Sequence, residues 1–269
     1  MSPDVSERSF EETIEATLTQ GSPNNALDGA SLAAEAVGWF AGRPGGYRKR
    51  VPEDYDRGLC LIHQDVLDFI LATQAKEWNK LKQHHGPALK EQFLRRLSSE
   101  IERRGALDVL RQGVKDSGCK FQLAYFRPSS GLNEELQRLH AANLFAVVRQ
   151  LHFSQKNEKS LDLVLFLNGI PIFTAELKNP LTGQNVEDAI KQYKTDRDPR
   201  EPIFSYGRCL AHFAIDPDLV YVTTHLVGHN TLFLPFNQGK FGGSREPPCA
   251  ADTEGLCHKL SLGTDLEPR

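Results

Sequence analysis

Residues 160–179, SLDLVLFLNGIPIFTAELKN, form the most informative stretch of the sequence. Two apolar runs flank Asn168-Gly169, a dipeptide that favours a tight hairpin turn because both residues tolerate positive φ. Apolar runs of this length are typical of buried strands. We therefore predict an antiparallel pair of strands over 161–169 and 170–178.

Charged residues interrupt both apolar runs: Asp162 opens the first, and Glu176 and Lys178 close the second. Residues two apart in a strand point to the same face, so Glu176 and Lys178 share a face and Leu177 points to the other. A two-residue turn alone points Asp162 away from Glu176, whereas one extra residue in the ladder places them opposite each other. Pro171, which lacks an N–H, marks a place where the ladder can be irregular.

Two carboxylates and a lysine on one sheet face suit the hydrolysis of a phosphodiester. Asp162, Glu176 and the carbonyl of Leu177 are hard oxygen ligands that could hold Mg²⁺. Such a cation polarises a phosphate and activates water, while Lys178 would stabilise the charge that builds up. The alternative is that these are surface charges at the border of a sheet. The apolar runs around both acids favour the first interpretation, because an unpaired charge there is costly.

In the rest of the chain, segments with the apolar spacing of a helix and segments with the apolar runs of a strand follow one another. Helices are predicted at 6–20, 63–82, 88–112 and 185–196, and 135–145 is a short helix or a turn. Further strands are predicted at 121–126, 145–154, 208–215, 219–224 and 231–236. The sequence therefore predicts an α/β fold in which helices flank a mixed central sheet and a helical insertion occupies about 56–118.

Composition excludes several classes of protein. The 269 residues carry a net charge of −3, so any nucleic-acid site must be local. No stretch approaches 18 apolar residues, and the N-terminus has no apolar signal segment, so we expect neither a membrane partner nor export. Five cysteines without a CxxC pair argue against a disulfide framework or a zinc site. We expect a reduced, cytoplasmic protein.

Two groups of basic residues are candidates for phosphate contacts or for ordinary solvated surface. One group follows the second strand of the predicted hairpin: Lys191, Lys194, Arg197 and Arg200. The other lies on the polar faces of the 88–112 helix: Lys90, Arg95, Arg96, Arg103 and Arg104. The sequence does not decide between the two interpretations for either group.

Long strings of residues also resemble a known family, the N-terminal nuclease region of the restriction (R) subunit of type I restriction–modification enzymes. These strings are SERSFEETI (6–14), DYDRGLCLI (54–62), QDVLDFILATQ (64–74), SSGLNEELQRL (129–139), NEKSLDLVLFLNGIPIFTAELKNPLTGQNVEDAIKQYKTDRDPREPIF (157–204), GRCLAHFAIDPDLVYVTT (207–224) and FLPFNQGK (233–240). They cover most of residues 6–240. The family's nuclease core is of the PD-(D/E)xK, restriction-endonuclease-like type.

This resemblance implies a Mg²⁺-dependent endonuclease that cuts unmodified DNA non-specifically within the full complex. It assigns the metal-binding acids to Asp162 and Glu176 and the lysine to Lys178. DNA and the modification and specificity subunits are the implied partners. ATP belongs to the family's motor domains; the sequence has no G-x-x-x-x-G-K-[ST] motif, so we expect that this chain does not translocate DNA itself.

The resemblance also suggests auxiliary residues. Some members carry a Gln-x-x-x-Tyr motif, of which only Tyr193 is present here, and Gln192 is a possible substitute for the missing glutamine. Plain core packing is the alternative role for Tyr193. A glutamate from the first helix often completes such sites, and Glu11 is our first choice. Glu7 and Glu15 are the alternatives, and all three could instead be solvated.

Residues 243–269 do not fit the family, because an AGNPP-like loop and a YLWE segment normally follow FGG there. Reading plausible codons one base later restores both, so a frame slip is one hypothesis and a natural disordered tail is the other. We expect a nuclease domain over 1–242 and a poorly packed tail. The alternative function is a catalytically silent DNA- or complex-binding fragment of a disrupted gene.

Overall fold

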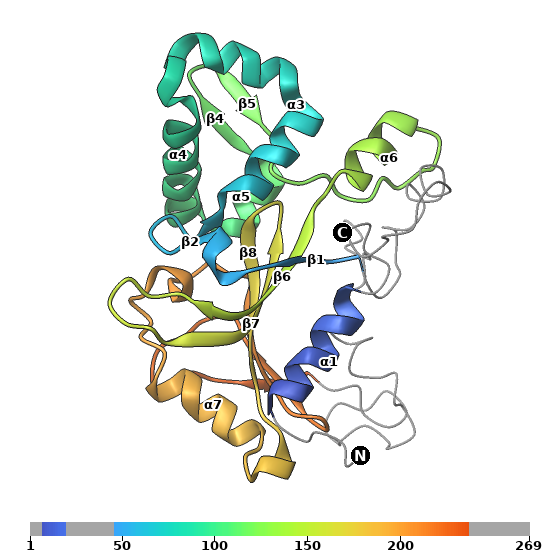
Figure 1. The fold of residues 1–269 in the computed structure, drawn as a ribbon. Helices are drawn as coiled ribbons and strands as arrows, with labels where there is room; N and C mark the ends of the chain where they lie inside the picture. The colour runs from blue at the N-terminus through green and yellow to red at the C-terminus, as the bar shows by residue number, and fades with distance from the viewer. Residues whose placement is uncertain (1–6, 20–45, 237–269) are drawn as a thin grey trace.

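A computed structural model describes residues 7–19 and 46–236 (Figure 1). The predictions about the tail at 243–269, including the frame slip, lie outside the described residues. So does the part of the predicted nuclease domain in 1–6, 20–45 and 237–242.

The centre of the molecule is a mixed sheet of seven strands in the order β1-β6-β7-β8-β9-β10-β11. The strands are β1 (Arg48–Arg50), β6 (Phe145–His152), β7 (Ser160–Leu167), β8 (Ile170–Leu177), β9 (Ala211–Ile215), β10 (Val220–Thr223) and β11 (Leu234–Pro235). The β1–β6 and β8–β9 pairs are parallel and the other pairs are antiparallel. The predicted α/β class with a mixed, helix-flanked sheet is confirmed.

Helices pack on both sides of this sheet. On one side, Ile14 and Leu18 of α1 (Glu7–Thr19) join the apolar cluster that contains Val147 and Leu163 of the sheet. On the other side, α7 (Val186–Thr195) packs against β8 and β9. The short helix α6 (Glu134–Ala141) precedes β6. Four 3-10 turns complete the described helical elements: η2 (Pro52–Asp54), η3 (Gly86–Ala88), η4 (Pro180–Thr182) and η5 (Pro202–Phe204).

The hairpin between β7 and β8 has the predicted Asn-Gly turn. Asn168 and Gly169 both have positive φ, 51° and 79°. The turn is buried under the insertion, where Gly169 lies so close to Ile62 and Val66 that an added Cβ would be 2.4 Å from the Ile62 carbonyl oxygen. Glycine is therefore required here for both its conformation and its size.

One extra residue in β8 shifts the register of this hairpin. At the turn Leu167 pairs with Ile170, but further along Leu165 pairs with Phe173 and Leu163 with Ala175. The shift falls between Leu165 and Phe166, beside Pro171, whose missing N–H cannot complete a regular ladder. Asp162 and Glu176 can lie opposite each other only if the ladder contains such an extra residue.

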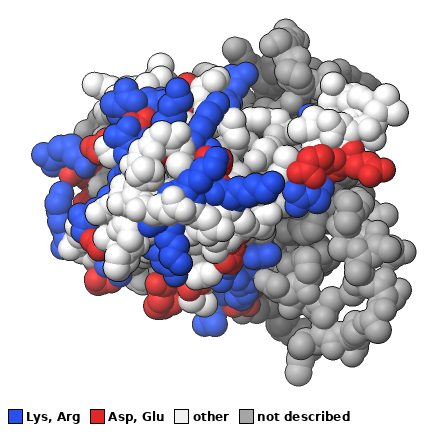
Figure 2. Space-filling model, turned by 90° about the horizontal axis from the view of Figure 1, so that it is seen from above, with Lys and Arg blue, Asp and Glu red and all other residues white. Residues whose placement is uncertain are grey.

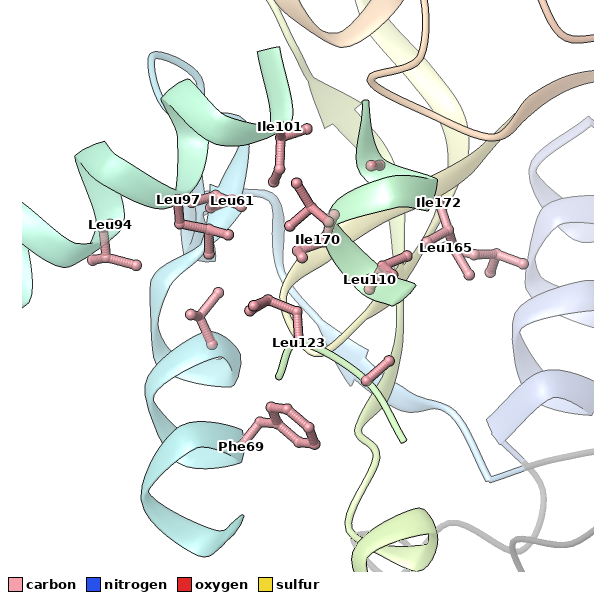
Figure 3. Close-up of a cluster of buried hydrophobic side chains, with 14 of the residues drawn as sticks. Leu61, Phe69, Leu94, Leu97, Ile101, Leu110, Leu123, Leu165, Ile170 and Ile172 are labelled. Carbon is pink, nitrogen blue, oxygen red and sulfur yellow. The ribbon is translucent and has the colours of Figure 1, made fainter. Parts of the chain in front are cut away.

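The insertion is a layer of helices and short strands, drawn at the top of Figure 1. It comprises β2 (Tyr55–Asp56), β3 (Leu61–Ile62), α3 (His63–His85), α4 (Leu89–Arg104), α5 (Ala106–Gln112), β4 (Val114–Asp116) and β5 (Cys119–Phe121). Its apolar residues share one core with the β7–β8 hairpin, as Figure 3 shows for Leu61, Leu110 and Leu123 around Leu165 and Ile170. The insertion therefore buries the turn of the hairpin rather than forming a separate unit.

The predicted strand at 121–126 is wrong beyond Phe121. Side-chain amides, rather than a neighbouring strand, satisfy this backbone. Gln74 accepts from the N–H and donates to the carbonyl of Gln122, at 2.7 and 2.9 Å, and Asn143 does the same for Tyr125, at 3.2 and 2.6 Å. The apolar side chains of this segment are thus buried although its backbone does not pair with a neighbouring strand.

None of the helices in the described part of the chain has the length and apolar composition that crossing a lipid bilayer requires.

We expect Gly169→Ala to lower the free energy of unfolding by about 3 kcal/mol, because the new methyl group meets backbone atoms as well as the positive φ. Gly118→Ala is the matched control: Gly118 also has positive φ, 83°, but a Cβ added there would meet nothing within 4 Å. That variant should cost about 1 kcal/mol. Equal losses in urea unfolding would contradict the close approach at Gly169.

Candidate active site

The register shift brings the two predicted acids onto neighbouring strands. Leu163 pairs with Ala175, so Asp162 and Glu176 occupy the next position along the ladder. Asp162 is half-buried, and its Oδ2 accepts a hydrogen bond of 2.8 Å from the backbone N–H of Leu177. That bond ties the carboxylate of β7 to the end of β8.

Glu176 is fully buried, and its two oxygens have different surroundings. Oε1 accepts a hydrogen bond of 2.6 Å from Nε of Arg197, whereas Oε2 has no hydrogen-bond partner among the described residues. Burial, with the neighbouring charge of Asp162, raises the pKa of Glu176 to about 8, although Arg197 opposes the shift. The carboxylate is thus held in a place where its own negative charge is unfavourable.

Arg197 is the counter-ion of Glu176 and is itself buried. Its NH2 group donates to the carbonyl of Ser160 at 2.7 Å, and its guanidinium lies 5.5 Å from the ring centroid of Phe153. This placement differs from the predicted surface contact with DNA phosphates, because the guanidinium is committed to the interior. The sequence reasoning grouped Arg197 with its basic neighbours and missed the partner 21 residues upstream.

Lys178 lies just beyond the end of β8 and is largely buried. Its Nζ is 3.4 Å from Oε1 of Glu7 on α1, and its backbone N–H donates to the carbonyl of Ile215 at 2.8 Å. The ammonium group therefore lies beside the carboxylate of Glu7, on a strand end that the bond to Ile215 fixes.

The first helix brings Glu11 to the same site through Gln150. Nε2 of Gln150 donates to Glu11 at 2.8 Å and lies 3.3 Å from Oδ1 of Asp162, so one amide bridges the two acids. Burial, followed by the charge of Asp162, raises the pKa of Glu11 to about 7. Of the three glutamates considered, Glu15 instead pairs with Lys49 at 2.7 Å.

Gln150 is a site residue that the sequence reasoning missed. It has a φ of 49° within β6, a strained conformation for a residue other than glycine, and Ser160 donates to its side-chain oxygen at 2.7 Å. The available signal was a polar residue inside the apolar strand 145–154, but only the β6–β7 pairing places it beside Asp162.

The two motif residues on α7 have different environments. Tyr193 is fully buried, and its hydroxyl is 2.8 Å from Oγ1 of Thr174, which in turn is 2.8 Å from Nδ1 of His212. Burial raises the pKa of Tyr193, and the charge of Glu176 adds to this shift. Gln192 is half-buried, outside the described hydrogen bonds around Asp162 and Glu176.

The remaining basic residues lie nearer the surface. Lys191 is exposed and Lys194 is half-buried on α7. Arg200 is exposed and pairs with Asp198 at 2.9 Å. These three, unlike Arg197, are in positions that solvent or a ligand can reach.

The donors around Asp162 fit a hard divalent cation. Asp162, Glu176 and the Leu177 carbonyl provide oxygen atoms, one of which, Oε2 of Glu176, is buried without a partner. Burial, and then repulsion from Asp162, raises the pKa of Glu11 and Glu176, and a cation would stabilise the charged form of both. Within residues 7–19 and 46–236, no three His, Cys, Asp or Glu side chains are already gathered as a metal site. To hold a cation, Asp162 and Glu176 therefore need a third ligand, either the main-chain carbonyl of Leu177 or Glu11 after a movement of its side chain.

Comparison with protein-family models gives a match. A family model described as the type I restriction enzyme R protein N terminus matches residues 70–231, more than half of the chain, and this range contains the hairpin with both acids and the lysine. No curated protein matches the chain.

The raised carboxyl pKa values predict how stability depends on pH in the absence of metal. Between about pH 5 and about pH 8 the folded protein retains protons that the unfolded chain has released, so stability falls as pH rises. Glu176→Gln and Glu11→Gln should each flatten this fall in urea unfolding measured with EDTA. Glu12→Gln is the control, because the pKa of Glu12 is lowered, chiefly by Arg8. An unchanged slope in Glu176→Gln would contradict the assignment.

Replacing Arg197 should be far more damaging than replacing its exposed neighbour. Arg197→Met leaves Glu176 buried without a counter-ion, which we expect to cost about 3 kcal/mol of unfolding free energy. Arg200→Ala, which removes an exposed pair, should cost about 0.5 kcal/mol or less. Chemical denaturation at pH 9, where Glu176 is ionised, measures both. Similar small losses would show that Arg197 is not a structural counter-ion.

Proposed function

Because this chain belongs to the family of type I restriction enzyme R protein N-terminal regions, we propose that it is a metal-dependent DNA endonuclease domain that hydrolyses phosphodiester bonds. The observation that supports the proposal is the shifted hairpin register, in which Asp162 and Glu176 occupy facing positions of β7 and β8 and Lys178 follows Glu176 by two residues. The buried, unpartnered Oε2 of Glu176 supports it further.

In this proposal Asp162, Glu176 and the carbonyl of Leu177 hold Mg²⁺. When bound, the cation polarises a phosphate and lowers the pKa of an attacking water. Lys178 binds the phosphate oxygens or orients the water from the end of β8, and its contact with Glu7 keeps the ammonium in place.

The surrounding residues position this site. Arg197 fixes one oxygen of Glu176, and the other has no hydrogen-bond partner among the described residues. Gln150 holds Glu11 next to Asp162. With a pKa of about 7, Glu11 can carry a proton at neutral pH and release it as positive charge accumulates nearby.

We also propose the setting in which this chemistry occurs. Lys191, Lys194 and Arg200 contact DNA phosphates near the site, and the modification and specificity subunits are the protein partners. ATP acts only through motor domains of the full-length family. A cytoplasmic location suits DNA as the substrate and is compatible with the free thiols of Cys60, Cys119 and Cys209.

The proposed activity predicts Mg²⁺-dependent nicking of supercoiled plasmid by the purified chain. Asp162→Asn, Glu176→Gln and Lys178→Ala should each lower the initial nicking rate about 100-fold or more, because each removes a group that acts on the transition state. EDTA should abolish nicking in the parent protein.

Two exposed residues outside the site provide controls, Glu53→Gln and Lys82→Ala, which should nick at the parental rate. Circular dichroism checks that every variant is folded. Nicking that survives in all three site variants would refute the assignment. If the folded parent does not nick at all, the alternative of a catalytically silent binding fragment is favoured instead.

A further inference from the structure

A basic cleft of about 440 Å³ lies in the insertion, between α4, the end of α5 and the β4–β5 hairpin. Five of its eight lining residues are basic and one is acidic. The basic residues are Arg96, Arg103, Arg104, Lys115 and Lys120. None of them belongs to the acid cluster of Asp162, Glu176 and Glu11, which lies at the end of the β7–β8 hairpin away from its turn.

Three arginines of the cleft converge on one carboxylate. Glu100 is buried, and its oxygens pair with Arg96 at 3.0 Å, Arg103 at 2.8 Å and Arg104 at 3.1 Å. Arg104 also bonds to Asp108 and to the carbonyl of Gly113. Glu100 thus orders three guanidinium groups, and together with Asp108 it leaves one of their three positive charges uncompensated.

Two lysines face each other across the β4–β5 hairpin on the opposite wall. Lys115 and Lys120 are directly paired residues of the two antiparallel strands, and both are exposed. Like charges directly opposite each other destabilise a strand pair. Their position at a cleft that already carries excess positive charge is explained if an anion binds between them and the arginines.

The insertion differs in charge from the chain as a whole. Residues 63–121 contain 11 Lys and Arg against 8 Asp and Glu, a net charge of +3, whereas the complete chain has −3. Figure 2, seen from the insertion end, shows Lys and Arg side chains over much of this face. The positive charge is therefore local to the part of the molecule that holds the cleft.

We propose that this cleft binds a backbone phosphate of DNA, as a second contact remote from the acid cluster. The phosphate class follows from the geometry, since guanidinium and ammonium groups around an open pocket match its charged oxygens. The choice of DNA as its source rests on the proposed function. The insertion and α7 lie at opposite ends of the molecule in Figure 1, so a duplex held at both points would lie along the sheet.

The test is duplex binding by the whole chain in EDTA, where hydrolysis cannot contribute. The double variant Lys115→Ala/Lys120→Ala should bind a 30-base-pair duplex more weakly, and the slope of log affinity against log salt should fall by about 2. The matched control, Lys76→Ala/Lys82→Ala, removes two exposed lysines of the same insertion outside the cleft. Its slope should stay near that of the parent.

Thermal unfolding provides an independent readout. Without anion at low salt, the double variant should melt at the parental temperature or slightly above, because a like-charge pair has been removed. Added inorganic phosphate should raise the melting temperature of the parent and of the control more than that of the double variant. This comparison also establishes that weaker DNA binding is not caused by unfolding.

Two outcomes would overturn the proposal. One is a double variant with the same duplex affinity and salt slope as the control. The other is a cleft-dependent response to inorganic phosphate without any change in duplex binding, which would assign the cleft to a small phosphate compound. Because binding is measured without metal, loss of nicking leaves this test unaffected, and the two proposals fail separately.

Discussion

The one-residue shift between β7 and β8 is the constraint on which the candidate site depends. With a regular ladder from the Asn168-Gly169 turn, Asp162 would face away from Glu176. The extra residue beside Pro171 reverses this relation, and the bond from the Leu177 N–H to Asp162 then joins the two strand ends. The insertion supports this arrangement because its apolar side chains pack over the turn and leave no room for a Cβ at Gly169.

The shift also explains the electrostatics around the acids. Burial is the main cause that raises the pKa of both Glu176 and Glu11, and the charge of Asp162, which the shift sets opposite Glu176, adds to it. The fold offsets this cost with positioned groups: Arg197 pairs with Glu176, and the amide of Gln150 bridges Asp162 and Glu11. A site whose acids are assembled against their own repulsion is suited to binding a cation, and for this reason we propose hydrolysis of a phosphodiester as its function.

The insertion contributes more than support for the hairpin. Its net positive charge, its arginines around Glu100 and the facing Lys115 and Lys120 separate it electrostatically from an otherwise acidic chain. The sequence left the basic face of the 88–112 helix undecided between solvated surface and phosphate contact. The cleft gives that question a defined location, because there α4 and the β4–β5 hairpin present their charges to the same space.

Local pattern alone determined much of this protein: the hairpin at 160–179, the Asn-Gly turn and the flanking helices follow from periodicity and turn chemistry. The roles of Asp162 and Glu176 remain a prediction from their pattern and from the family resemblance, and the register that pairs them came from the structure. Local pattern could not separate Arg197 from its exposed neighbour Arg200, recognise Gln150, or show that the segment after Phe121 is bonded by the side chains of Gln74 and Asn143. Those features depend on partners far away in the chain. Only the tertiary structure decided them, because burial and hydrogen bonding are set by which surfaces meet, and a linear pattern records only which side of an element is apolar.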